Sequence, residues 1–405
     1  MTKPNSPPAL VLGCHKIGLG VIRALGIERV PVVAVYYHRA DMGHVSKHIV
    51  ARYRCPNPNH EELDFVNFLQ GLSQRWGGSV LIPSDDATLV PVSKHKALLQ
   101  PHFKVAANEW DITRAYVEKQ HTYALAEKVG VPCPRTGLPR SLEEAIDFLD
   151  QVGWPCIIKP SVSHRFYELF GSKMLVARNQ AEFVEAYRAA EEYKIPLLLQ
   201  ELIPGDDTCG VNYNSYRVEG EVVSEFTARK VRLTPPGIGF PRVVVSRDLP
   251  EVHHLGRKIL KALNYQGFSC TEFKQDQRDG AYKLMEVNGR HNLSSLLAVA
   301  CGLNFPYLNY RHLVDGKVPR GNFHFRTGVY WIDLERDFLQ SVRSYRQERL
   351  PLRNYLHPYL SEHVFAVWSL QDPYPFLKRL ADAALWGPAS LLEKAGHLFQ
   401  SKARN

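Results

Sequence analysis

The sequence contains no long hydrophobic run and no paired cysteines, and these absences argue against two classes of protein. No apolar run approaches the roughly 20 residues that a membrane-spanning helix needs. The seven cysteines are scattered singly without a CxxC pair, which argues against a disulfide framework and against a structural zinc site. We expect most of them to be small, buried apolar residues. Residues 1–8 carry no charged-then-apolar signal, so we expect a cytoplasmic protein.

Acidic residues are in the minority: 41 Asp and Glu face 50 Lys and Arg, for a net charge of +9. Such an excess suits an anionic partner. The basic residues are dispersed, however, and no helix-turn-helix, RNP-like or zinc-finger spacing is present, which favours anionic small molecules over nucleic acid. A hydrophobic fraction of 45% in 405 residues is sufficient for two or three packed domains.

The first unit is predicted to be Rossmann-like. The apolar run Ala9 to Leu12 reads as a strand, glycines and a helical pattern follow, and Pro31 to Val35 reads as a second buried strand. The glycine spacing is not GxGxxG, which favours a packing or substrate-loop role for the glycines over dinucleotide binding.

Polar residues follow another strand of this unit, Val80 to Pro83. Ser84, Asp85 and Asp86 come directly after it, where open α/β sheets usually bind ligands. This polar stretch is equally suited to cap the helix that begins near Ala87. The two roles are compatible.

Lysines near the starts and ends of predicted elements mark the next segment. A helix is predicted to carry Arg114, Lys119 and Lys128, and Ser141 to Glu144 resembles a capping box. Lys159 lies at the end of an apolar strand, where its ammonium group could reach phosphate oxygens. Taken singly, each lysine is better explained as a surface residue.

A strand that ends at Gln200-Glu201 runs into an extended turn that reaches Asp207. Such a turn can offer backbone groups to an adenine edge, and a carboxylate a few residues on can hold ribose hydroxyls. Residues 210–247 then alternate like antiparallel strands. The basic run of Arg229, Lys230 and Arg232 beside a loop suits a phosphate or an acceptor carboxylate, or else a solvated strand face.

The sharpest feature is a predicted hairpin that carries Glu272 on one strand and Glu286 and Asn288 on the other. Residues two apart on a strand point to the same face, so Glu286 and Asn288 lie together and Glu272 can lie opposite them. Two carboxylates and an amide oxygen form a hard-oxygen site that suits magnesium. The alternative is a solvated face, but Glu286 lies in an otherwise apolar strand, where a lone acid needs a partner.

The order of these features resembles the ATP-grasp superfamily, over about residues 108–306. The Asn288-Gly289-Arg290 end and the residues after it resemble the predicted carboxylate–amine ligase branch, which includes D-aspartate ligase-like proteins. The resemblance implies an α/β (α+β) fold, with a Rossmann-like pre-ATP-grasp domain before a two-subdomain ATP-grasp fold. The expected domains are residues 1–107, 108–194, 195–319 and a C-terminal extension, 320–405.

The resemblance also implies roles for individual residues. Contacts with ATP are implied for Lys119, Lys159, Lys173, Gln200, Glu201, Ile203 and Asp207. Coordination of Mg²⁺ or Mn²⁺ is implied for Glu272, Glu286 and Asn288. Catalytic roles are implied for Arg290, Arg229 and Lys230, and substrate contacts for Ser84, Asp85, Ser294 and Ser295. Only Gly171 is present in the implied phosphate lid, residues 161–172, where the superfamily commonly has several glycines.

The implied reaction is ATP-dependent ligation of a small carboxylate to an amine through an acyl phosphate. Two other hypotheses remain: a nucleotide-binding regulator or scaffold without turnover, and a nucleotide-dependent oxidoreductase, which lacks its glycine fingerprint. The extension is predicted to form strands at 323–332 and 364–370 and amphipathic helices over 376–399. These helices suit docking onto the enzyme's own core or a second copy, or contact with the inner membrane surface.

Overall fold

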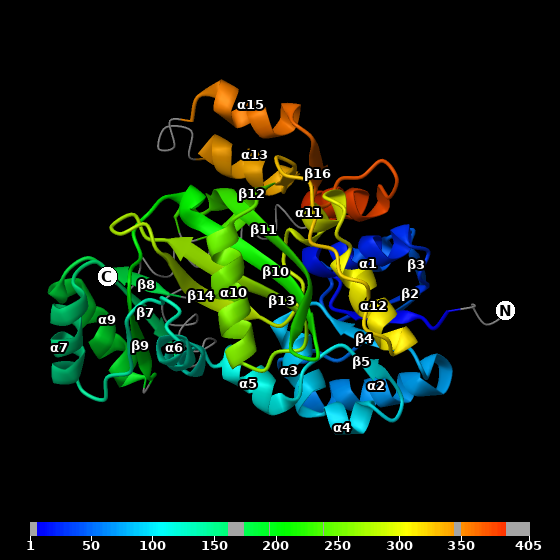
Figure 1. Ribbon diagram of the computed structural model, residues 1–405, viewed down its shortest axis with the longest axis horizontal. Coiled ribbons are helices and arrows are strands. Elements are labelled where there is room, and N and C mark those ends of the chain that lie inside the picture. The colour runs from blue at the N-terminus through cyan, green and yellow to red at the C-terminus, as the bar shows by residue number, and fades with distance from the viewer. Residues whose placement is uncertain (1–5, 161–173, 194, 238, 344–349, 386–405) are drawn as a thin grey trace.

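The structure is a computed structural model that describes residues 6–160, 174–193, 195–237, 239–343 and 350–385. Figure 1 shows the central, mainly antiparallel sheet with a parallel α/β unit on one side and a small sheet with two helices on the other. Among the described residues, no helix is both long and apolar enough to cross a bilayer.

The N-terminal unit is a five-stranded parallel sheet in the order β3-β2-β1-β4-β5. Its strands are β1 Ala9–Leu12, β2 Val32–Tyr36, β3 Ile49–Arg54, β4 Val80–Pro83 and β5 Lys104–Val105. Its helices are α1 Lys16–Ile27, η1 Gly43–Val45, α2 Glu62–Trp76, α3 Asp86–Lys94 and α4 Lys96–Leu99. Both faces of the sheet are covered, which explains why β1, β2 and β4 are nearly continuous apolar runs. The predicted Rossmann-like opening is confirmed.

A smaller antiparallel sheet, in the order β6-β9-β7-β8, forms the second unit. Its elements are β6 Thr136–Gly137, α7 Leu142–Val152, β7 Cys156–Pro160, β8 Leu175–Ala177, α9 Gln180–Glu192 and β9 Leu197–Glu201. Ser141 caps α7 by accepting from Glu144 N at 3.1 Å, as predicted. The single helix predicted through Arg114 and Lys128 is wrong, because the chain leaves the helical conformation at Glu118 and forms α5 Trp110–Val117 and α6 Lys119–Lys128.

The central sheet has seven strands in the order β14-β13-β10-β11-β12-β15-β16. Its chain runs through η2 Asp207–Cys209, β10 Gly210–Val218, β11 Glu221–Thr234, β12 Phe240–Ser246, α10 Pro250–Ala262, β13 Gly267–Gln275, β14 Tyr282–Asn288, α11 Ser295–Ala300 and α12 Phe305–Asp315. Helix α10 covers one face, where Val211, Phe273 and Ile259 share a core. The opposite face packs in part against α11, α12 and α1, around Phe226, Cys270 and Leu297.

The C-terminal extension completes the central sheet. It consists of β15 Tyr330–Ile332, α13 Leu334–Arg343, α15 Leu352–Leu360, β16 His363–Phe365 and a further helical stretch at 374–385. The strands predicted over 323–332 and 364–370 are present but shorter. Buried ion pairs fix the extension: Asp337 lies 2.8 Å from Arg232, and Asp372 lies 3.0 Å from Arg23. All seven cysteines are free, and six are buried, as expected.

Candidate functional site

Glu272 and Glu286 face each other across the hairpin of β13 and β14, where they are direct cross-strand partners. Asn288, two residues after Glu286 on the same face, donates from Nδ2 to Glu286 Oε1 at 3.2 Å. The predicted convergence of these three side chains is therefore confirmed as geometry. Each carboxylate also has a lysine partner: Lys119 Nζ is 3.1 Å from Glu286, and Lys230 Nζ is 2.5 Å from Glu272.

These contacts keep the charged forms stable. The Lys119 ammonium lowers the pKa of the Glu286 carboxyl even though burial opposes this, and Glu286 in turn raises the pKa of Lys119. Burial disfavours the charge on Lys230, but the Glu272 carboxylate outweighs it and raises the pKa of that lysine. The cluster is thus a partly exposed arrangement of two anions and two cations.

The donor set of this cluster fits a divalent metal ion. Two carboxylates and one amide oxygen are hard ligands, which Mg²⁺ combines with waters and phosphate oxygens. No group of three His, Cys, Asp or Glu side chains suited to a metal occurs in the described part of the chain, so a dedicated all-protein metal cage is not indicated there. The lysines now paired with the acids are suited to bind phosphate oxygens.

Lys159 extends the cationic side of the cluster from the small sheet. Its ammonium donates to Gln200 Oε1 at 2.6 Å, and Gln200 Nε2 donates to Thr136 Oγ1 at 3.0 Å. Strands β7 and β9 are paired, which places Lys159 and Gln200 side by side. Burial, with repulsion from Lys119, lowers the pKa of Lys159 to about 7. Lys173 and the predicted lid, residues 161–172, lie outside the described residues.

The strand end predicted to bind adenine is rigidly held. The Glu201 carboxylate accepts from the Arg135 backbone amide at 3.1 Å and pairs with Arg278. Ile203 is buried just beyond it. Asp207 accepts from the backbone amides of Leu233 at 2.7 Å and of Gly237 at 2.6 Å. Its carboxylate therefore secures the loop after β11, and the predicted ribose contact stays a prediction.

Arg290, just beyond β14, reaches across to the N-terminal unit. Its Nε and Nη2 atoms donate to the two Asp86 oxygens at 3.0 and 3.1 Å. Burial disfavours its charge, but Asp86 outweighs this effect and raises the Arg290 pKa. Gly289 is required here, because a Cβ atom would lie 2.1 Å from the Tyr116 hydroxyl oxygen.

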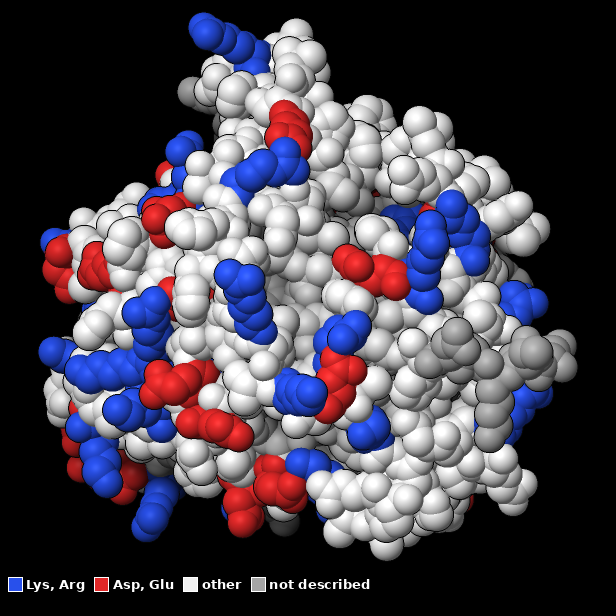
Figure 2. All heavy atoms as spheres, turned by 45° about the vertical axis from the view of Figure 1, so that its right-hand side comes forward, with Lys and Arg blue, Asp and Glu red and all other residues white. Residues whose placement is uncertain are grey.

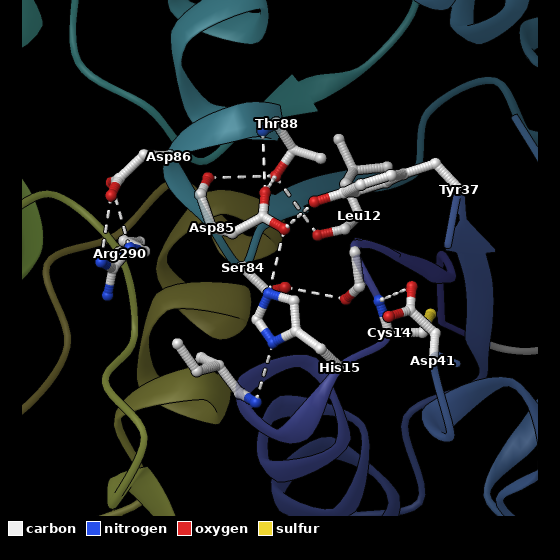
Figure 3. A network of polar contacts seen from close by, with 12 residues as sticks. Leu12, Cys14, His15, Tyr37, Asp41, Ser84, Asp85, Asp86, Thr88 and Arg290 are labelled. Atoms are coloured by element: carbon white, nitrogen blue, oxygen red, sulfur yellow. Dashed lines mark hydrogen bonds and ion pairs between the residues drawn. The ribbon is translucent and has the colours of Figure 1, made fainter. Parts of the chain in front are cut away.

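Figure 3 shows the polar network at the carboxyl ends of β1, β2 and β4. Asp85 caps α3 by accepting from Thr88 N at 2.8 Å, which confirms the N-cap predicted for this polar stretch. The same carboxylate lies 3.0 Å from His15 Nε2 and accepts from the Tyr37 hydroxyl at 2.7 Å. Burial would raise the Asp85 pKa, but the His15 contact and the other hydrogen bonds lower it.

The structure does not bring every predicted residue into the cluster. Ser84 is buried and donates to Gly13 O at 2.8 Å. Ser294 and Ser295 are also buried, at the start of α11. Arg229 is on the face of β11 opposite Lys230, where it donates to Thr208 O and the Tyr282 hydroxyl, both at 3.0 Å.

The third residue of the basic run, Arg232, also lies away from the site. It is buried and forms a bidentate pair with Asp337, at 2.9 and 2.8 Å, in the C-terminal extension. The three side chains of the run therefore do not share one site, because strand alternation and a bulge at Val231 send them to different surroundings. Anion binding by the run stays a prediction.

Comparisons with known proteins agree with this arrangement. The sequence model of the family described as carbamoyl-phosphate synthase L chain, ATP binding domain, matches residues 118–196. The chain is 27% identical over 240 residues to D-aspartate ligase from Enterococcus faecium, covering 56% of each protein. Over these regions the chain is similar to ATP-grasp proteins. Its match thus spans little more than half the length of that relative.

Solved structures share the fold of this chain. Biotin carboxylase from Campylobacter jejuni superposes with a TM-score of 0.64 at 15% identity, over 80% of this chain and 74% of that chain. An L-amino acid ligase from Bacillus licheniformis superposes with a TM-score of 0.58 at 16% identity, over 79% of this chain and 78% of that chain.

Some residues of the site were not found from the sequence. Asp86 was considered only as part of a polar stretch after β4, and its pairing with Arg290 spans 204 positions. His15 and Tyr37 follow other strands of the same parallel sheet. Both residues could have been found from their positions just after predicted strands, because the carboxyl ends of parallel strands lie at one edge of the sheet.

Proposed function

We propose that this chain is an ATP-grasp enzyme, an ATP- and Mg²⁺-dependent carboxylate–amine ligase that works through an acyl-phosphate intermediate. The single observation that carries the proposal is the pairing of Glu272 with Glu286, beside Asn288, with a lysine on each carboxylate. Hard oxygen ligands next to two lysine cations suit a metal-bound triphosphate.

The side chains divide between binding and chemistry. Lys119 and Lys159 would bind phosphate oxygens. Lys119 would then release Glu286, and Lys159 would release Gln200, so that both side chains could bind other ligands. A bound magnesium ion would neutralise charge on the transferring phosphate. The strand end at Gln200, Glu201 and Ile203 would receive the adenine. Asp207 would hold the ribose, sharing its oxygens with the loop that it secures.

Arg290 would stabilise the acyl phosphate through charge complementarity, with Lys230 on the metal side. The substrate carboxylate attacks the γ-phosphorus and ADP leaves; the amine then attacks the acyl carbon, and phosphate leaves as the carbon–nitrogen bond forms. Asp85, at the rim formed by the N-terminal unit, is placed to contact a substrate. The burial of Ser84, Ser294 and Ser295 favours a supporting role under that rim.

The amino-acid ligases among the similar proteins support an amino acid as one substrate. D-aspartate ligase and the L-amino acid ligase are named for that class. We place the reaction in the cytoplasm, in a chain divided at residues 107, 194 and 319, and propose that it can form homo-oligomers. Neither nucleic acid nor nicotinamide is part of this proposal.

The test is ATP-dependent phosphate release over pooled amino acids and other small carboxylates and amines, with mass spectrometry of the product. Support requires a condensed product and phosphate that depend on both substrates and on magnesium. ATP binding without turnover across the pools would instead favour a nucleotide-binding regulator.

A further inference from the structure

Two helices of the C-terminal extension, α13 and α15, expose large apolar side chains at one end of the molecule (Figure 1). On α15, Leu352, Leu356 and Leu360 recur every four residues and therefore line one side of the helix. Leu352 is 70% exposed and Leu360 is 83% exposed. The solvent-facing side of a helix in a soluble protein is normally polar, whereas on α15 this side carries apolar residues.

Helix α13 shows the same inversion. Phe338, Leu339 and Val342 are exposed, whereas the charged Asp337 points inward to Arg232 on the central sheet. Tyr359 of α15 donates to the same Asp337 carboxylate at 2.7 Å. Polar contacts thus anchor both helices from beneath, and their outward sides are apolar.

The exposed charges on the two helices themselves are basic, and the exposed acid that follows α15, Glu362, is paired with Arg326 at 2.6 Å. Arg343 and Arg353 are exposed on α13 and α15. Within these two helices as described, the partly exposed acid is Glu335, and it is held 2.6 Å from Arg379. In Figure 2 most of the upper end of the molecule is white, with Lys or Arg at its tip and an acidic residue beside a basic one just below it. Exposed apolar patches edged by polar residues mark interaction sites.

We propose that the outward sides of α13 and α15 bind an anionic membrane surface. The leucines and Phe338 would enter the boundary between headgroups and acyl chains, and Arg343 and Arg353 would lie against lipid phosphates. A second copy of this chain is a poorer occupant, because it would bring the same arginines against each other. The net charge of +9 adds long-range attraction to an anionic surface.

The experiment is co-sedimentation of the full chain with vesicles of phosphatidylcholine alone, or of phosphatidylcholine and phosphatidylglycerol in equal parts. The chain should sediment with the anionic vesicles. The variant Leu352→Ser/Leu356→Ser/Leu360→Ser should lower the partition coefficient about tenfold or more, and Arg343→Gln/Arg353→Gln should lower binding to anionic vesicles. The matched control, Ile27→Ser/Val50→Ser/Leu63→Ser, changes three exposed apolar residues of the N-terminal unit and should bind like the parent chain.

Equal sedimentation of the parent chain and both test variants would overturn the proposal. Light scattering could also overturn it. If the parent chain is a dimer and the triple leucine variant is a monomer, the surface binds a second copy of the chain. Thermal unfolding checks that each variant is folded. If the triple variant unfolds early, the arginine variant decides the outcome, because its side chains are exposed and can be replaced without loss of packing.

Discussion

The Asp86 carboxylate orients the Arg290 guanidinium from across the boundary between the parallel sheet and the central sheet. Both oxygens take part, at 3.0 and 3.1 Å from Nε and Nη2. Bidentate pairs of this kind fix direction as well as distance. The arginine proposed to stabilise the acyl phosphate is thus oriented by the N-terminal unit, which also forms the rim around Asp85.

Replacing Asp86 with asparagine should weaken this orientation without removing Arg290. We expect kcat/KM for ligation to fall about tenfold, the usual scale for losing a partner that orients a functional group. Steady-state phosphate release measures the change. Asp64→Asn, at an exposed position of α2, is the matched control and should have parental kinetics. Parental kinetics for Asp86→Asn as well would contradict the positioning role.

Glu286→Gln should abolish turnover while the fold remains intact. The amide keeps the shape of the side chain but loses the charge that a metal ion and Lys119 require. The expected loss in kcat is at least about 100-fold. Phosphate release measures turnover, circular dichroism checks the fold, and Glu221→Gln, at an exposed position on β11, serves as the control. Unchanged activity would rule out the metal assignment.

ATP binding should be accompanied by proton uptake at Lys159. Its pKa is lowered to about 7 in the free protein, so the amine is largely neutral at about pH 8. Bound phosphates would favour the charged form, and the lysine would then take up a proton. Uptake should disappear as the pH falls through 7, because the group is then already charged.

Titration calorimetry of MgATP in buffers of different ionisation enthalpy measures the net number of protons taken up on binding. Lys159→Met keeps the length of the side chain and should bind ATP more weakly, with the uptake removed. Uptake of the same size in this variant would show that another group is protonated.

Asp337→Asn should destabilise the protein strongly. The carboxylate is fully buried between Arg232 and Arg242, and its loss would leave buried arginines without a counter-charge. Breaking a buried pair costs about 3–5 kcal/mol, and urea unfolding should show a loss of that size. Asp315→Asn breaks an exposed pair with Arg311 and should cost about 1 kcal/mol or less. Similar losses in both variants would contradict the anchoring role of Asp337.

Much of the site could be predicted because local patterns specify it. Side-chain alternation along the hairpin predicted that Glu286 and Asn288 share one face. The apolar run before Lys159 predicted that this lysine lies at the end of a strand. The break at Glu118 and the divergence of Arg229 from Lys230 were missed. The divergence of Arg229 from Lys230 follows from alternation along β11, and the bulge at Val231 then changes the surroundings of Arg232. No proline or glycine marks the break at Glu118.

The sequence by itself determined the periodic elements, the parallel unit at the start and the acidic hairpin, because side-chain alternation and buried apolar runs are local properties of the chain. Only the tertiary structure decided that Arg290 binds Asp86, that Arg232 is buried against Asp337, and that the outward sides of α13 and α15 are apolar. Ion pairs between residues about 100 or 200 positions apart, and the side of a helix that faces solvent, depend on how the sheets pack, and no local pattern encodes that packing.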